Sequence, residues 1–190
     1  MRMTGLAAAL VLAYGGVTAG QQPAAHAGMA NATPVATATA DIKGEGISGT
    51  ATLTEFKHGD SSVVQVELTV SGLKPGLHGV HLHAVGKCEP PAFTAAGGHF
   101  DPGPAGNPDP DMNHPFHMGD LPNLKVGDDG KGTLQAVTTR ITLTDSLVTA
   151  FDADGTAIII HGNPDQGITG EAKSGVSGGA RVACGVVTKK

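Results

Sequence analysis

Six histidines and one aspartate fall in three separate blocks of this 190-residue chain, and together they could bind metal. His81 and His83 stand two apart in a stretch that predicts a β-strand, so both imidazoles would point to one face. Taken singly, a His-x-His pattern occurs by chance, and His161 could be an ordinary hydrogen-bonded residue at a strand end. The other members share one long loop: His99, His114, His117 and Asp120. The combination favours a metal centre over a set of unrelated structural roles.

The ligand types narrow the choice of metal. Imidazole suits copper, zinc, nickel and iron, whereas calcium and magnesium prefer oxygen ligands. A structural zinc cluster would commonly use cysteine. The two cysteines here, Cys88 and Cys184, favour a disulfide if the chain is exported, the alternative being two buried free thiols. A site made of imidazoles suits a copper ion that cycles between two oxidation states.

Composition predicts one domain of short strands. The chain has 29 glycines, 12 prolines and only 3% aromatic residues, which suits many turns and argues against long helices. Its length is enough for one domain with a sizeable core. The net charge of -5 makes nucleic acid an unsuitable partner. An anionic substrate would need a local positive patch on such a protein.

The N-terminal segment predicts export. A basic start at Met1-Arg2 precedes an apolar run over residues 6–19, and small residues around Ala25-His26-Ala27 offer a cleavage site. The run is shorter than the roughly 20 residues of a membrane span, although a single anchor is the alternative. We therefore expect a signal peptide at 1–27, a flexible lead-in at 28–41 and one domain at 42–190. After cleavage no membrane span would remain, and the protein would be periplasmic or secreted.

Several stretches have the alternating or apolar pattern of strands, and turn residues separate them. They are 49–56, 64–70, 77–85, 132–137, 158–161 and 181–187. Two long segments between them, 86–120 and 162–180, carry little periodicity, and loops of that length are usually functional. Residues 145–151 could be a short turn of helix or a strand edge. This pattern predicts an all-β antiparallel sandwich or barrel.

Four segments, in order, resemble the copper-zinc superoxide dismutase family, in its exported bacterial form. They are Gly76-Leu77-His78-Gly79-Val80-His81-Leu82-His83, Ala96-Gly97-Gly98-His99-Phe100-Asp101-Pro102, His117-Met118-Gly119-Asp120-Leu121-Pro122-Asn123 and Gly179-Ala180-Arg181-Val182-Ala183-Cys184-Gly185-Val186. The match covers roughly residues 42–187. It implies a Greek-key β-barrel or sandwich with two long functional loops. It also implies an oxidoreductase that converts superoxide anion to oxygen and hydrogen peroxide at copper.

The resemblance assigns a role to each matching residue. It implies copper binding by His81, His83, His99 and His161, and zinc binding by His99, His117 and Asp120. His99 would bridge the two metals and carry a proton during turnover. Arg181 would attract and bind the anion beside the copper, and Lys173 could add to that field. Asp165 would orient the ligands, and Cys88 would pair with Cys184.

One part of the zinc site departs from the family pattern. The family usually has a further zinc histidine eight or nine residues after the bridging one, where this chain has Asn107 and Pro108. Because zinc takes four ligands, we predict that His114 supplies the missing one. The alternative is a weak or empty zinc site in a copper-dependent enzyme.

Two other classes of protein remain open at this stage. A non-catalytic exported copper-binding or buffering domain would need the histidines but not Arg181. A structural sandwich domain would be expected to have lost copper ligands, and none is lost here. The sequence leaves a monomer and a homodimer equally open.

Overall fold

The computed structural model describes residues 32–102, 117–171 and 174–190. The predicted signal peptide at 1–27 lies outside these residues, as do His114 and Lys173. Within the described part of the chain, no helix has the length and apolar character needed to cross a membrane.

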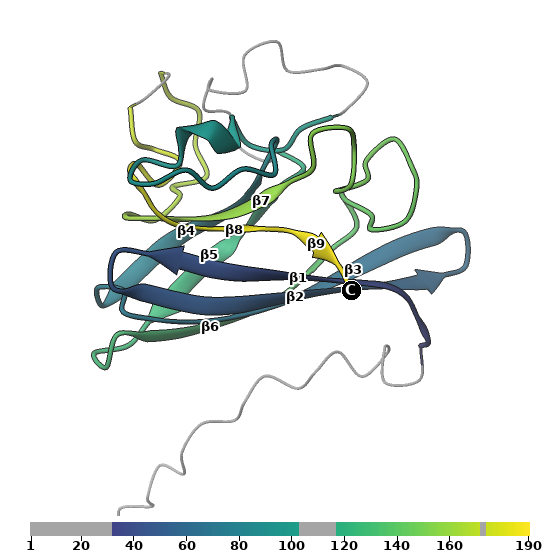
Figure 1. Cartoon of the computed structure of the whole chain (residues 1–190), viewed down its shortest axis with the longest axis horizontal. Helices are drawn as coiled ribbons and strands as arrows, with labels where there is room; N and C mark the ends of the chain where they lie inside the picture. The colour runs from purple at the N-terminus through teal and green to yellow at the C-terminus, as the bar shows by residue number, and fades with distance from the viewer. Residues whose placement is uncertain (1–31, 103–116, 172–173) are drawn as a thin grey trace, which may run out of the picture. The chain divides into compact units, whose positions relative to one another are not determined.

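Eight antiparallel strands close into a barrel, and a ninth short strand extends it (Figure 1). Around the barrel the order is β1, β2, β3, β6, β5, β4, β7 and β8, and β8 returns to β1. Because β3 pairs with β6 instead of β4, the connections cross the barrel in Greek-key fashion. The strands are β1 Pro34–Gly44, β2 Ile47–His58, β3 Ser61–Ser71, β4 Gly76–His83, β5 Asp120–Val126, β6 Lys131–Thr138, β7 Ala157–His161, β8 Arg181–Val186 and β9 Thr188–Lys189. The all-β prediction is confirmed.

Strand β1 corrects the prediction of a flexible lead-in over residues 28–41. It begins at Pro34 and pairs with β2 on one side and with β8 and β9 on the other. Ala38, Ala40 and Ile42 are at most 1% exposed, and they alternate with more exposed residues. The sequence did not reveal this alternation because two of the three buried residues are alanine, whose small side chain gives the pattern little hydrophobic contrast.

Strand β5 was also absent from the predicted elements. Its inward residues Leu121, Leu124 and Val126 are buried, but Pro122 interrupts the pattern. The segment 145–151 forms turns with one isolated bridge, from Thr142 to Thr149, and no helix. The only helical segment among the described residues is the single turn η1, Thr94–Ala96.

A buried carboxylate fastens one of the crossing connections to the barrel. Glu55 on β2 is 0% exposed, and its Oε2 accepts hydrogen bonds of 2.7 Å from the backbone N–H groups of Leu143 and Thr144. Its Oε1 accepts a third, of 2.8 Å, from the Thr144 hydroxyl. Burial alone would raise the pKa of Glu55, but these hydrogen bonds outweigh it and lower the pKa. The side chain therefore remains an anion and satisfies the polar groups of the connection.

Strand β4 places histidines between the barrel and the loops that cover it. Val80 and Leu82 point into the barrel core, and His81 and His83 point to the opposite face, yet all four are 0% exposed. The connections that follow β4 and β7 supply the cover, and Figure 1 draws both above the same part of the barrel. Strands β5 and β7 pair with β4 on its two sides. The imidazoles of β4 are consequently held on a rigid surface.

Candidate metal centre

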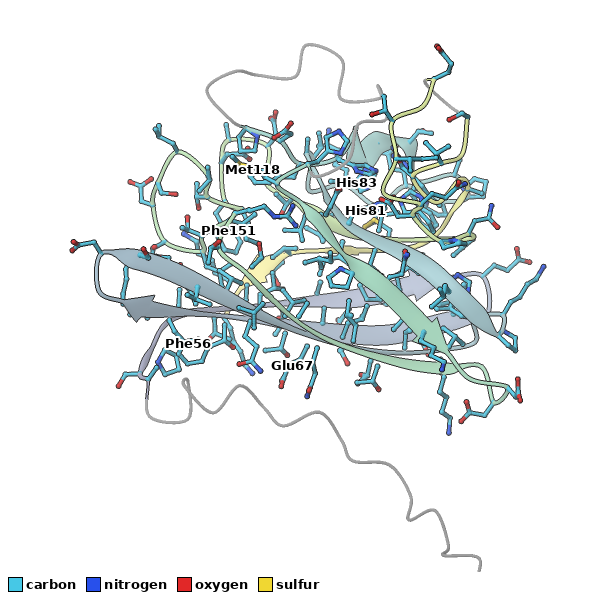
Figure 2. All side chains as sticks on the ribbon, turned by 180° about the vertical axis from the view of Figure 1, so that it is seen from behind. Phe56, Glu67, His81, His83, Met118 and Phe151 are labelled. Atoms are coloured by element: carbon cyan, nitrogen blue, oxygen red, sulfur yellow. A yellow bond between two sulfur atoms is a disulfide. The ribbon has the colours of Figure 1, made fainter. Side chains whose placement is uncertain are left out.

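Four imidazoles converge on the outer face of the barrel. His81 and His83 come from β4, as Figure 2 shows. His161 ends β7, and His99 lies in the loop that returns over β4. One nitrogen from each ring lies within 4.8 Å of the others. The ring centroids of His81 and His99 are 3.9 Å apart, and those of His83 and His99 are 5.0 Å apart. The structure thus brings together the four histidines that the sequence predicted for copper.

Hydrogen bonds fix which nitrogen of each ring faces the centre. His83 Nδ1 and His161 Nδ1 lie 3.0 Å from the carbonyl oxygens of Gly97 and Gly179, so both nitrogens must carry the proton. Their Nε2 atoms are then lone-pair acceptors, and they face each other at 3.4 Å. His81 Nε2 donates to Asp165 Oδ2 at 2.8 Å, and its buried Nδ1 has no hydrogen-bond partner among the described residues. Inward-facing lone pairs with no proton between them fit a bound cation.

Metal ligands must be unprotonated, and the surroundings of His83, His99 and His161 favour the neutral ring. Burial lowers the pKa of His161 to about 3, and neighbouring His81 adds to the effect. Burial also lowers the pKa of His83 well below its ordinary value of 6.5, with help from the charges of His99, Arg181 and His161. The pKa of His99 is lowered mainly by burial.

A second group of ligands shares His99 with the first. His99 Nδ1 lies 2.8 Å from Asp120 Oδ1, and His117 Nδ1 lies 3.4 Å from Asp120 Oδ2. The backbone N–H of His117 donates to the same Oδ2 at 2.9 Å. Burial alone would raise the pKa of Asp120, but hydrogen bonds from His117 and His99 lower it strongly, so the carboxylate stays ionised. Two imidazoles and one carboxylate form a donor set that suits zinc.

Asp165 lies beside both groups and is itself held in place. It offers a carboxylate oxygen within 4.8 Å of ligand atoms of His81 and Asp120. The Asn123 side chain grips its backbone, accepting from Asp165 N–H at 2.9 Å and donating to Asp165 C=O at 2.8 Å. The hydrogen bond from His81 is the main reason that the pKa of Asp165 is lowered. This places Asp165 where the sequence predicted an orienting carboxylate.

Arg181 begins β8 and lies against the loop that carries His99. Its Nη1 donates to Phe93 C=O at 2.9 Å and its Nη2 to Gly97 C=O at 2.6 Å. The Gly97 oxygen therefore accepts from both Arg181 and His83. The same loop is joined to β8 by the Cys88–Cys184 disulfide, which confirms the predicted pairing.

Several residues of the site were not predicted from the sequence. Asn123 hydrogen-bonds the backbone of Asp165 and is the last residue of the 117–123 motif. Its place in that motif is the one sequence signal that could have indicated a role in the site. Arg140 donates to the Asp120 carbonyl from the connection after β6. Phe93 and Gly97 act through backbone carbonyls, which leave no trace in side-chain type.

The fold and the imidazole cluster together define a β-barrel metalloprotein. The copper/zinc superoxide dismutase family matches residues 47–187 of the chain. A Cu-Zn superoxide dismutase of Deinococcus radiodurans is 41% identical over 150 residues, covering 74% of this chain and 76% of the relative. One from Caulobacter vibrioides is 38% identical, covering 79% and 84%. A crystal structure of a SOD-like protein from Bacillus subtilis superimposes with a TM-score of 0.64 at 31% identity, covering 78% of this chain and 96% of that one.

The chain therefore belongs to the copper/zinc superoxide dismutase family. It is an oxidoreductase whose substrate is superoxide and whose metals are copper and zinc. The resemblance drawn from the four sequence segments is confirmed.

Proposed function

We propose that His81, His83, His99 and His161 hold the copper at which this chain disproportionates superoxide. The observation that carries the proposal is the tautomer pattern, which leaves one buried lone pair on each of three rings directed at a common point. His99, His117 and Asp120 would hold zinc, with His114 as the fourth ligand.

Copper held by these four histidines would supply the redox chemistry, as an acceptor and donor of one electron. The protein supplies binding and protons. Arg181 attracts the anion and donates hydrogen bonds to it, because a guanidinium stays charged at any working pH. His99 Nε2, the ring nitrogen turned away from Asp120, would alternate between binding copper and holding a proton, which it gives to the departing peroxide. With a proton from solvent, two superoxide anions and two protons yield one oxygen and one hydrogen peroxide.

Asp165 and two backbone carbonyls fix the orientation of the other three copper ligands. The carboxylate accepts from His81 Nε2, which fixes the ring and makes Nδ1 the more basic nitrogen. Gly97 and Gly179 do the same for His83 and His161. Because His81, His83 and His161 are almost fully buried, the centre admits a small anion more readily than a large one.

The decisive experiment combines metal content with the superoxide dismutation rate. Protein purified from residue 28 onward and loaded with both metals should contain about one copper and one zinc and approach the diffusional ceiling of about 10⁸–10⁹ M⁻¹s⁻¹. Copper alone with good activity would reject the zinc half of the proposal. Copper without activity would instead indicate a copper-binding or buffering domain.

The role of His114 has a separate test. His114→Ala should lower the zinc content of purified protein while copper content is maintained. Unchanged zinc in this variant would show that the fourth ligand comes from elsewhere.

We further propose that residues 1–27 export the chain to the periplasm or the exterior. The Cys88–Cys184 disulfide supports this, since such bonds persist in oxidising compartments. N-terminal sequencing of protein from fractionated cells should find cleavage near residue 27 outside the cytoplasm. A full-length chain in the cytoplasmic fraction would contradict export. Sedimentation of the same material would separate a monomer from a homodimer.

A further inference from the structure

Two hydrogen bonds to one short piece of backbone help to position the guanidinium of Arg181. Both carbonyls that it contacts, those of Phe93 and Gly97, belong to the loop between Cys88 and His99. Arginine has a long flexible side chain, so the place of its charge depends on what its donors meet. A change in the position of these two carbonyls should therefore move the guanidinium.

Phe93 has an unusual backbone conformation at this point. Its φ of 53° and ψ of 28° are left-handed, and among the described residues it is the only non-glycine with positive φ. Such a conformation is disfavoured for a bulky side chain and persists only when the surroundings enforce it. The left-handed conformation turns the Phe93 carbonyl toward two donors, Arg181 Nη1 and the Ala96 N–H, which donates at 3.2 Å.

The aromatic ring supplies the enforcement. Phe93 is 6% exposed and packs in a small apolar cluster separate from the main core, with Ala96, Ala157, Ile159, Cys184 and Cys88. This cluster joins the loop to β7, β8 and the disulfide. Phe93 and Arg181 also line an open groove of about 900 Å³, together with the disulfide cysteines Cys88 and Cys184 of the same cluster. The ring is therefore a principal contact that holds this part of the loop against the barrel.

We infer that Phe93 is a positioning residue for Arg181, with the buried ring setting where the anion-binding guanidinium lies. The inference rests on the proposed role of Arg181 as the anion-binding group. It adds a residue to the substrate site that neither touches substrate nor carries charge.

The test measures anion affinity with azide as the probe, read from the visible absorption of the copper-loaded protein. Phe93→Ala should weaken azide binding about fivefold to tenfold, the size expected when the interaction with the guanidinium is lost to the extent of one ordinary hydrogen bond. Phe93→Leu, which keeps most of the apolar volume, should change it less than about twofold. Phe93→Gly accepts the left-handed backbone without strain but lacks the ring, so it should weaken binding as alanine does. The matched control is Phe151→Ala, which removes a ring packed against the main core.

A double-mutant cycle tests the positioning role of Phe93 separately from the proposed role of Arg181 in binding the anion. In an Arg181→Ala background, Phe93→Ala should have no further effect on azide affinity, because its effect passes through the arginine. If Arg181→Ala alone leaves azide affinity unchanged, the proposed role of Arg181 fails. If Arg181→Ala weakens binding but Phe93→Gly binds like wild type, only the inference about Phe93 is overturned. A thermal scan of each variant measures its loss of stability. If Phe151→Ala weakens azide binding as much as Phe93→Ala does, the inference about Phe93 is also overturned.

Discussion

Removing the metals should make this protein acutely sensitive to mild acid, because its buried imidazoles resist protonation. The pKa of His161 is lowered from 6.5 to about 3, and those of His83 and His99 are lowered as well. In the unfolded chain these rings would take up protons near pH 6.5, so the unfolded state binds more protons below that value. The free energy of unfolding is therefore fully present above pH 6.5 and falls as pH decreases toward 3.

The size of the effect follows from the same values. For His161 alone, the gap between 6.5 and about 3 corresponds to about 5 kcal/mol lost by pH 3, since the side chain is almost fully buried. Each ring contributes at most about 1.4 kcal/mol per pH unit while it is protonated in the unfolded chain but not in the folded protein, and His83 and His99 add to the slope of His161 in the same direction. Domains of this size have about 5–15 kcal/mol of stability in total. The metal-free protein should therefore lose a large share of its stability in mild acid, with about 2 kcal/mol lost through His161 alone by pH 5.

Urea titrations of the chelator-treated protein at intervals from pH 7.5 to pH 5 would measure this slope. Within that window the carboxylates Asp120, Asp165 and Glu55 contribute little, because their lowered pKa values shift their contribution to below about pH 4.5. His161→Gln should reduce the slope by about one proton, and metal-loaded protein should be more stable than metal-free protein at every pH in this window, because metal binding adds to the free energy of unfolding. A metal-free protein equally stable at pH 7 and pH 5, or a His161→Gln variant with an unaltered slope, would refute the reasoning.

Three further changes have expected outcomes. Arg181→Ala should lower the bimolecular rate with superoxide at least about tenfold and flatten its dependence on ionic strength, measured by pulse radiolysis; an unchanged rate would favour a copper-binding domain. Replacing Cys88 and Cys184 together by serine should cost about 4–5 kcal/mol in urea denaturation, because the bond spans 96 residues, and a loss under 1 kcal/mol would contradict this. Glu55→Ala should cost about 2–4 kcal/mol by leaving buried N–H groups without acceptors, whereas a neutral result would mean that water replaces the carboxylate.

The sequence predicted the fold class and the histidine centre because both depend on side-chain type and order. His81 and His83 lie two apart on a strand, so geometry alone places them on one face, and the structure confirms this. His161 could not be joined to them from spacing. The resemblance supplied that link, and the β4–β7 register now accounts for it, since His81 pairs with Ile159.

The missed features share a physical cause. Ala38 and Ala40 are buried in β1, but a sheet can bury a small residue without leaving a strong hydrophobic pattern. The contacts that position the site, from Phe93 and Gly97 to Arg181, use carbonyl oxygens that every residue possesses. Their role depends on where the chain turns, and no local pattern of residues encodes that.

The closure of the barrel has a consequence for how the protein is made. Strand β1 completes its pairing only with β8 and β9, the last strands of the chain, so a nascent polypeptide cannot close the ring during synthesis. Until then the outer sides of β1 and β7 remain open edges, which other chains could pair with. Strand β8 also carries Arg181 and Cys184. The pairing of β8 with β1, which closes the barrel, therefore also brings Arg181 and Cys184 into place. A chain without β8 could neither close the barrel nor form the active site.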